Sequence, residues 1–208
     1  MNNVQTPTAR RPDEATAKTT NRLVFPHGVA NLTLRVDESM PDAYRAAFYG
    51  PKPRVTEADG VISIDYSRFN PLIWGRTSAD ITLSPSASWS IEIGDGISHW
   101  DGDLRNIQLM SIEVRGGLNK AELRLPQPTG TVLIRVSGGV SHLTLHRPAG
   151  VPARVHIGGG ASKLALDTQY LGAVGGPVRL ETPDYSAAVE RYDVEIGGGA
   201  SKTTIERD

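Results

Sequence analysis

A short glycine-centred motif recurs through the chain at a nearly constant interval. Six segments align on one glycine, at positions 28, 96, 117, 139, 160 and 199. The three middle intervals are 21, 22 and 21 residues, and the flanking intervals of 68 and 39 residues are close to three and two such periods. A fixed period of this size predicts supersecondary units that stack on one another.

Apolar residues recur at every second position on both sides of these glycines. Ile112 and Val114 precede one glycine and Leu143 and Leu145 follow another, each with a polar or charged residue between them. A period of two is typical of a strand with one buried face. The glycines permit a sharp corner at positive φ, and a second corner rich in proline and glycine follows at 126–130 and 147–152. Each unit is therefore predicted to contain two strands and two corners.

We expect the units to stack in sequence order, so that identical positions lie above one another. This predicts an all-β, single-domain β-solenoid with ~21-residue repeats and parallel stacked strands; roughly eight coils, ~4.8 Å apart, would give a rod of about 38 Å. In this register Ile134 lies between Ile112 and Val155. The alternative is an antiparallel sandwich with a strand every 8–12 residues or so. A sandwich requires neither a 21-residue period nor a recurring glycine corner, and we therefore favour the solenoid.

The pattern divides the chain into a tail and one repeat-built domain. Residues 1–21 contain Val4 as their only large aliphatic residue and are expected to be a disordered tail. Residues 22–208 are assigned to the domain. The repeat is weakest between 35 and 85, where the segment 39–50 fits a strand or a short helix, and again between 172 and 191. We interpret both stretches as insertions into coils.

Composition excludes several classes of function. Lys and Arg number 22 and Asp and Glu 23, a net charge of −1 that does not favour nucleic acid as a partner. Cysteine is absent, which removes disulfides, thiolate metal sites and cysteine nucleophiles. The sequence shows no signal peptide and no apolar run long enough to span a membrane, so a cytoplasmic location is expected.

The repeated corner also resembles a known family. Gly-Gly-Ala-Ser-Lys occurs at 159–163 and again at 198–202. This pattern is similar to the bacterial "putative adhesin" (toast-rack) family of β-solenoid domains, and the resemblance covers about residues 22–207. It implies a β-solenoid fold and an adhesin-like scaffold role. The envelope-anchored relatives differ from this chain, which shows no transmembrane segment.

The same corner carries an outward-facing series of polar residues. It is no phosphate-binding loop, because Lys163 follows Ser162 and no helix is expected after it. Three positions after each glycine lie Asn31, His99, Lys120, His142, Lys163 and Lys202. This series fits a basic stripe for an anionic polymer or, with Asp101 and Glu122 on the same face, a solvated surface of mixed charge; we favour the second interpretation. No catalytic, cofactor-binding or metal-ligating residues are assigned.

One segment has the composition of a protein interface. Between two predicted strands, residues 66–76 combine aromatic, aliphatic and arginine side chains, which are enriched in interface hot spots. The candidate interaction residues are Arg68, Phe69, Leu72, Ile73, Trp74 and Arg76. The alternative is that this segment folds back and closes one side of the core.

A second candidate interface follows from the last repeat. The final unit reaches Glu206, two residues before the last residue of the sequence, so we expect no further segment to cover it. An uncovered coil exposes unpaired backbone groups and the edge of its core. We therefore expect an end-to-end contact through Val194, Ile196 and Ile205, and a homo-oligomer.

These features favour a non-enzymatic β-solenoid that acts as a scaffold or protein-interaction module, with a protein or a second copy as partner. One alternative is a carbohydrate-active or ligand-binding enzyme on a β-helix scaffold. Another is a polymerising structural protein similar to bactofilins. No cofactor is expected in the favoured case.

Overall fold

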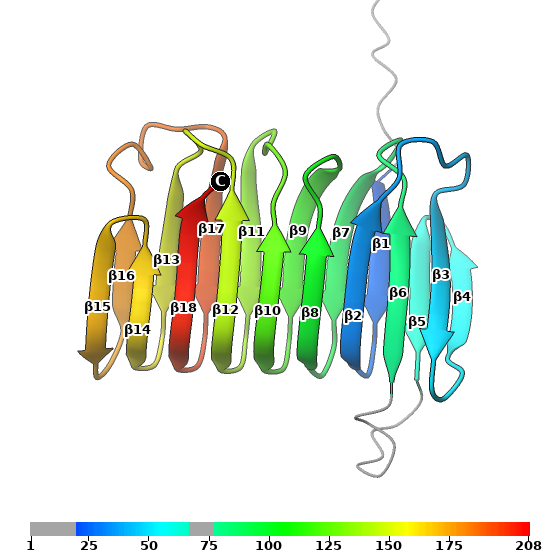
Figure 1. Ribbon diagram of the computed structural model, residues 1–208, viewed down its shortest axis with the longest axis horizontal. Helices are drawn as coiled ribbons and strands as arrows, with labels where there is room; N and C mark the ends of the chain where they lie inside the picture. Colours follow the sequence, from blue (N-terminus) through cyan, green and yellow to red (C-terminus); the bar gives the residue numbers. More distant parts are fainter. Residues whose placement is uncertain (1–19, 67–76) are drawn as a thin grey trace, which may run out of the picture.

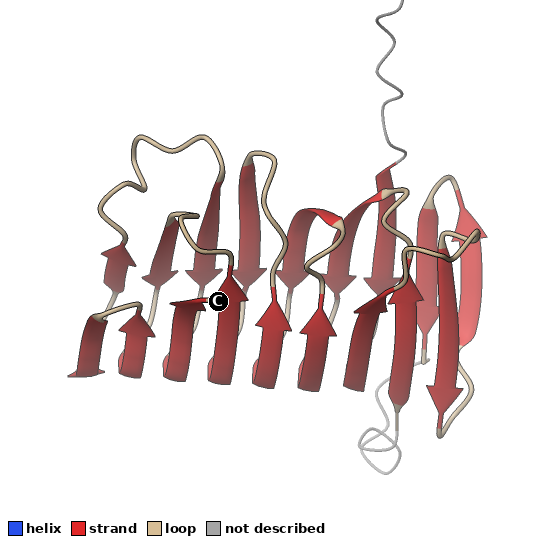
Figure 2. Cartoon of the chain, turned by 45° about the horizontal axis from the view of Figure 1, so that its top comes forward, coloured by secondary structure: helices blue, strands red, loops and turns tan. Residues whose placement is uncertain are grey.

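The computed structural model describes residues 20–66 and 77–208, and these residues form two nine-stranded β-sheets packed face to face (Figures 1 and 2). The first sheet has the spatial order β16 (Val178–Glu181), β13 (Ala153–Ile157), β17 (Arg191–Ile196), β11 (Thr131–Val136), β9 (Gln108–Val114), β7 (Ser88–Ile93), β1 (Thr20–Phe25), β5 (Val61–Asp65) and β4 (Arg54–Ala58). The second sheet has the order β15 (Gln169–Val174), β14 (Ala161–Leu166), β18 (Ala200–Arg207), β12 (Val140–Arg147), β10 (Leu118–Arg124), β8 (Ile97–Asp103), β2 (Val29–Val36), β6 (Ser78–Leu83) and β3 (Tyr44–Tyr49). The described residues contain no helix, and the all-β prediction is confirmed.

Most neighbouring strands run parallel. The exceptions lie at the two ends of the sheets, where β16, β15, β4 and β3 each pair antiparallel with their neighbour. Parallel stacking is therefore found within a mixed pair of sheets. The segment 39–50, for which a strand and a helix both fitted the sequence, contains strand β3. Strand β1 begins at Thr20, inside the range expected to be a disordered tail.

The inward faces of the two sheets form one elongated core. Along the first sheet, one register position gives a continuous ladder of side chains in the order Ile62, Leu23, Ile91, Ile112, Ile134, Val194 and Val155. Each of these side chains is buried. Trp89 is also fully buried, and its indole N–H donates a hydrogen bond to the Ser84 carbonyl over 2.9 Å. The alternating pattern of the sequence thus marks the side of each strand that faces the core.

The glycine corners stack along one edge of the molecule, at the bottom of Figure 1. Backbone hydrogen bonds of 2.9 to 3.2 Å connect them: Val29 N donates to Gly96 O, Ile97 N to Gly117 O, Leu118 N to Gly139 O, Val140 N to Gly199 O, and Ala200 N to Gly160 O. Glycine is needed here mainly because neighbouring corners approach closely. A Cβ atom on Gly116 would lie 0.9 Å from the Asp95 carbonyl oxygen. Of the six anchor glycines only Gly28 has a positive φ, so the expected role of positive φ is wrong for the other five.

The order of the units differs from the order in the sequence. The β1–β2 unit lies between the β5–β6 and β7–β8 units, and the β17–β18 unit lies between β11–β12 and β13–β14. The neighbours of Ile134 are therefore Ile112 and Val194, and the expected contact with Val155 is wrong. For the β17–β18 unit, the reason lies in the chain after β14. The chain folds back there as the antiparallel strands β15 and β16, and β17 and β18 then pair between the β11–β12 and β13–β14 units.

The interior position of the β17–β18 unit also contradicts the end-to-end contact expected from the sequence. Val194, Ile196 and Ile205 belong to the β17–β18 unit, which is paired on both sides, and each is at most 1% exposed. They are core residues and offer no end surface. The two ends of the stack are formed instead by β15 with β16 and by β3 with β4 (Figure 1).

Candidate functional site

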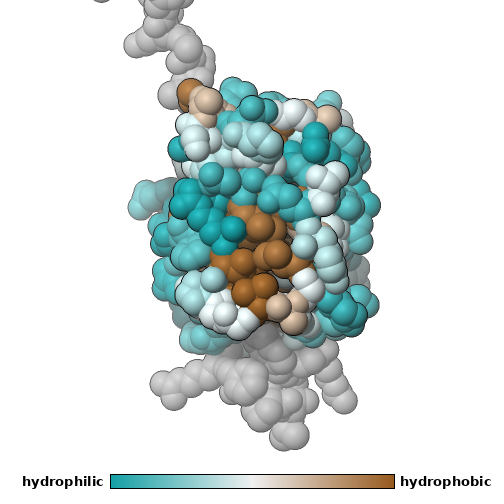
Figure 3. Space-filling model, turned by 90° about the vertical axis from the view of Figure 1, so that its left-hand side faces the viewer, coloured by the Kyte–Doolittle hydropathy of each residue, from teal (hydrophilic) through white to brown (hydrophobic). Residues whose placement is uncertain are grey.

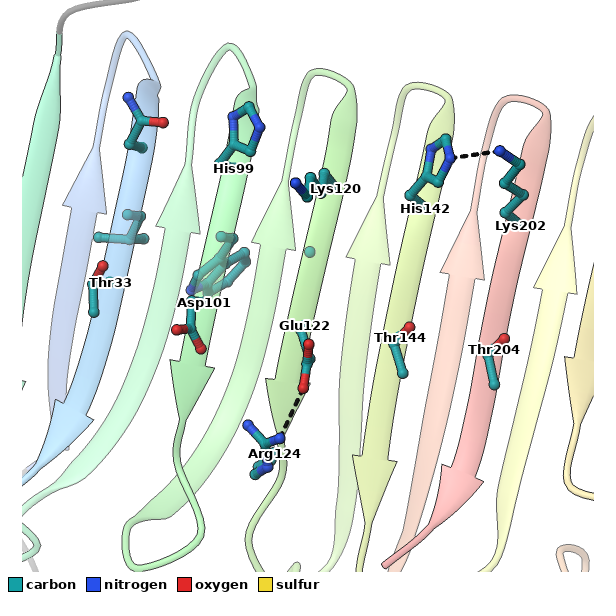
Figure 4. A pocket seen from close by; sticks show the side chains of 14 residues that line it. Thr33, His99, Asp101, Lys120, Glu122, Arg124, His142, Thr144, Lys202 and Thr204 are labelled. Carbon is teal, nitrogen blue, oxygen red and sulfur yellow. Dashed lines mark hydrogen bonds and ion pairs between the residues drawn. The ribbon is translucent and has the colours of Figure 1, made fainter.

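A groove of about 740 Å³ runs across the outer face of the second sheet. Its lining comes from five neighbouring strands, β2, β8, β10, β12 and β18. Figure 4 shows the lining side chains in two rows that cross the strands. Because both rows consist of positions that repeat from strand to strand, the groove is a direct product of the stacked units.

A repeated backbone irregularity creates the first row. In β12, Val140 and Leu143 face the core, while Ser141 and His142 between them both face outward. Two consecutive outward residues require an extra residue in the strand, as in a β-bulge. His142 takes up this distortion with a φ of 56°. The equivalent residues of β10, β14 and β18 have φ values of 53°, 55° and 51°.

We call the first row the cationic row. In spatial order it contains His99, Lys120, His142, Lys202 and Lys163, of which the last lies on β14, just outside the groove. The sequence predicted these residues on one outer face, and the structure places them there. It changes their order, because the insertion of β18 puts Lys202 between His142 and Lys163.

Hydrogen bonds orient part of the cationic row. The Lys202 ammonium lies 2.8 Å from His142 Nε2, and the Ser141 hydroxyl lies 2.8 Å from His142 Nδ1. An ammonium group can only donate, so His142 Nε2 accepts this hydrogen bond. His142 therefore holds Lys202 in place on the outer surface.

The second row lies two residues further along each strand. It contains Asp101, Glu122, Thr144, Thr204 and Ala165. Its two carboxylates already have partners: Arg35 is 2.8 Å from Asp101, and Arg124 is 2.8 Å from Glu122. The side of the groove formed by β12 and β18 therefore presents threonine hydroxyls beside the lysines.

Several other charged residues at this face have partners. Hydrogen bonds from Arg105 lower the pKa of the Asp103 carboxyl. His146 lies 3.2 Å from Glu206 and 3.5 Å from Glu122. Among the residues that the structure describes, no group of three or more metal-ligating side chains could hold an ion. These contacts stabilise the surface, and within the described residues none of Lys120, Lys163 and Lys202 makes an ion pair.

A buried ion pair lies at the carboxyl end of β12, at the end of the strands opposite the glycine corners. The Arg147 guanidinium is 2% exposed and contacts Asp167, which also forms an ion pair with Arg207 at 3.1 Å. Burial lowers the pKa of Arg147, and Asp167 opposes this effect. Arg147 also donates to the Val151 carbonyl, so the pair fixes the loop after β12 and plays a structural part.

Some of the sequence-based site predictions cannot be compared with the structure, and one feature of the site was not predicted. The candidate loop residues Arg68, Phe69, Leu72, Ile73, Trp74 and Arg76 lie outside the described residues. The repeated bulge was not predicted. Its signal is present in the sequence, because each corner is followed by two polar residues between apolar ones, as in Ser-Lys at 162–163 and 201–202.

Comparison with solved structures identifies a protein with a similar fold. The fold is similar to that of a "putative cell adhesion protein" from Clostridium sporogenes, with a TM-score of 0.68, 20% sequence identity, and coverage of 92% of this chain and 94% of that one. At this identity the likeness concerns the fold. No protein-family model and no curated protein matches the chain. In the described part of the chain, no helix is long and apolar enough to cross a membrane.

Proposed function

We propose that this protein is a non-enzymatic binding module of adhesin-like type, built on a solenoid-like β-scaffold, that holds an extended ligand across the outer face of its second sheet. The observation that carries this proposal is the groove, which crosses five strands and repeats the same side-chain positions on each. Four spacings of ~4.8 Å give it a length of about 19 Å. A long shallow surface of this kind suits a polymer better than a small substrate.

The alternative of a carbohydrate-active enzyme on this scaffold finds less support. General acid–base catalysis requires a titratable group positioned for proton transfer at the reacting atoms. The groove carboxylates, Asp101 and Glu122, are exposed and engaged with arginines. The name of the structural neighbour, a "putative cell adhesion protein", agrees with a binding role.

Filling the groove tests the proposal. Thr144→Trp and Thr204→Trp each place a large ring in the second row, beside the cationic row. The purified full chain is applied to surfaces coated separately with neutral polysaccharides, acidic polysaccharides and mucin-type glycoproteins, and retention is measured by surface plasmon resonance. We expect the wild type to be retained on at least one coat, and each variant to bind it roughly tenfold more weakly.

Matched controls lie on the other sheet. Ser90 and Ser111 face outward from β7 and β9, where their hydroxyls are 3.2 Å apart. Ser90→Trp and Ser111→Trp add the same bulk there and should leave retention unchanged. Retention on no coat would overturn the proposal. Release of shortened polymer by the wild type would establish the enzyme instead.

A second candidate function is self-association, and one end of the stack favours it. Figure 3 shows an apolar patch in the middle of the β15–β16 end. Leu171, Val178 and Leu180 pack against the core there but are only partly buried. Strands β15 and β16 each have an edge to which no other described strand is bonded. An open edge beside an apolar patch is a site for strand pairing.

The charges of β16 fit a second copy of this chain. Arg179 and Glu181 flank Leu180 on the outer face, 2.7 Å apart. If two copies of β16 pair antiparallel about Leu180, Arg179 of each copy faces Glu181 of the other. This contact would close as a two-fold dimer. A bactofilin-like filament would need a second contact, at the β3–β4 end.

A further inference from the structure

We infer that the cationic row and the threonines beside it, on β12, β18 and β14, bind a linear acidic polysaccharide. This inference rests on the proposed binding function and names its ligand class. The residues concerned are His142, Lys202, Lys163, Thr144 and Thr204.

The distribution of lysines in the chain is uneven. The sequence contains five lysines, and Lys120, Lys163 and Lys202 occupy the same position of the repeat. Arginines make the ion pairs of the described surface, for example Arg35 with Asp101 and Arg135 with Glu195. Within the described ranges, none of these three lysines has a carboxylate oxygen within 4.0 Å. Their charges are thus available to a ligand.

The arrangement of these lysines destabilises the folded protein. Ser162 and Leu164 pair with Ser201 and Thr203, which places Lys163 and Lys202 at equivalent bulge positions on adjacent strands. Like charges on neighbouring strands repel each other. Both residues also have positive φ, at 55° and 51°, which costs free energy for a residue with a Cβ atom. The bulge imposes this φ on the backbone, but it does not require a lysine side chain there.

The surroundings of the lysines indicate a glycan rather than a peptide. Thr144 and Thr204 offer hydroxyls for hydrogen bonds to sugar hydroxyl groups. A peptide would gain most by adding a strand to a sheet edge, whereas these residues lie on a sheet face whose backbone is already bonded on both sides.

The same surroundings indicate an acidic glycan rather than a neutral one. Neutral sugars are commonly held by stacking on Trp, Tyr or Phe rings, and the one such ring among the groove residues, Trp100, is 2% exposed. Recognition must therefore rest on charge and hydrogen bonds. The polymer would cross the strands, with the ~4.8 Å strand spacing on the scale of one sugar ring.

Affinity measurements with defined polymers test the inference. Polygalacturonate and heparin serve as acidic probes and dextran as the neutral one, in titration calorimetry with the full chain. We expect binding of an acidic probe, no binding of dextran, and affinity that falls as salt is added, because exposed charges are screened. Lys163→Gln combined with Lys202→Gln should weaken binding roughly tenfold, since each exposed ion contact contributes modestly.

The control pair removes two positive charges elsewhere. Lys52 and Arg54 are exposed at the far end of the stack, and Lys52→Gln combined with Arg54→Gln should change affinity less than twofold or so. Thermal melting verifies that both double variants are folded. Equal losses in both pairs, equal binding of dextran, or binding of polyglutamate as tight as that of polygalacturonate would overturn the inference. If groove-dependent retention on another coat persists while acidic polysaccharides do not bind, this inference fails and the proposed function stands.

Discussion

At the scale of single residues, the unusual feature is a set of long polar side chains in a backbone conformation that favours glycine or asparagine. Lys120, His142, Lys163 and Lys202 have φ between 51° and 56° on four neighbouring strands. The conformation is imposed by geometry, because two outward residues must fit between two inward ones. The side chain itself does not require it. A residue without a Cβ atom would adopt it more easily.

Two substitutions of Lys120 test whether the positive φ or the strand propensity of the side chain has the larger effect on the free energy of unfolding. Lys120 makes no ion pair within the described structure, so few contacts are lost. Lys120→Gly should equal or exceed the wild type in free energy of unfolding, while Lys120→Val should lose about 1–2 kcal/mol, because a β-branched residue is least compatible with positive φ. Chemical denaturation monitored by circular dichroism measures both values.

Thr144 provides the matched control for this pair. It lies two residues after a bulge, on strand backbone without a positive φ. There the order should reverse, with Thr144→Gly less stable than Thr144→Val by up to about 1 kcal/mol. Lys120→Gly less stable than Lys120→Val would show that the bulge is not strained.

At the scale of elements, the two ends of the stack are closed differently. At the β3–β4 end, Glu57 pairs with the buried Ile62 and so occupies an inward position, where it accepts a hydrogen bond from Tyr44. Burial and this bond raise the pKa of the Tyr44 hydroxyl to about 12. An inward charge protects an edge from pairing. The β15–β16 end has Leu180 at the corresponding place in the ladder.

Exchanging the charges of β16 tests the proposed two-fold contact. Arg179→Glu places two acidic residues on each copy and should weaken the dimer. Arg179→Glu combined with Glu181→Arg restores opposite charges across the two-fold axis and should restore dimerisation. Sedimentation velocity over a range of concentrations measures the dimer fraction. A wild type that stays monomeric throughout, or a double variant no better than the single one, would exclude this contact.

At the scale of the whole molecule, both terminal units lie inside the stack. The β1–β2 unit and the β17–β18 unit each pair on both sides with segments from elsewhere in the chain. Strand β17 contacts β11 and β13, and the buried Tyr192 donates a hydrogen bond from its hydroxyl to the Pro126 carbonyl over 2.7 Å. The β17–β18 unit therefore connects the β11–β12 unit to the β13–β14 unit.

Removal of residues 191–208 should consequently abolish cooperative folding. A terminal repeat removed from an ordinary stack leaves the other repeats folded, whereas this deletion removes a layer from the interior of the core. The truncated chain is expected to lose its sigmoidal thermal transition in circular dichroism. Adding a peptide of residues 191–208 should restore it, because the vacant position is specific. A truncated chain that melts like the wild type would contradict the observed order of units.

Local sequence predicted much of the candidate site and little of its surroundings. The outward position of Lys120, His142, Lys163 and Lys202 followed from a fixed distance to the glycine corner, which is a property of one unit. The contact between His142 and Lys202 did not follow, because these residues are 60 positions apart in sequence. The pairing of Asp101 with Arg35, which lies on another strand, could not be predicted for the same reason.

The unit can be recognised from the sequence alone: two strands, the side of each that faces the core, and a corner where glycine fits between close neighbours. Alternation and glycine placement act within a few residues, so they can be recognised without knowledge of the fold. The tertiary structure decided which unit lies beside which. The corners at 158–163 and 197–202 are identical in sequence, and parallel strand edges offer the same backbone groups to any neighbour. The order is therefore set by the reversal of the chain at β15 and β16 and by packing of the whole core, which places the last unit in the interior and brings Lys202 between His142 and Lys163.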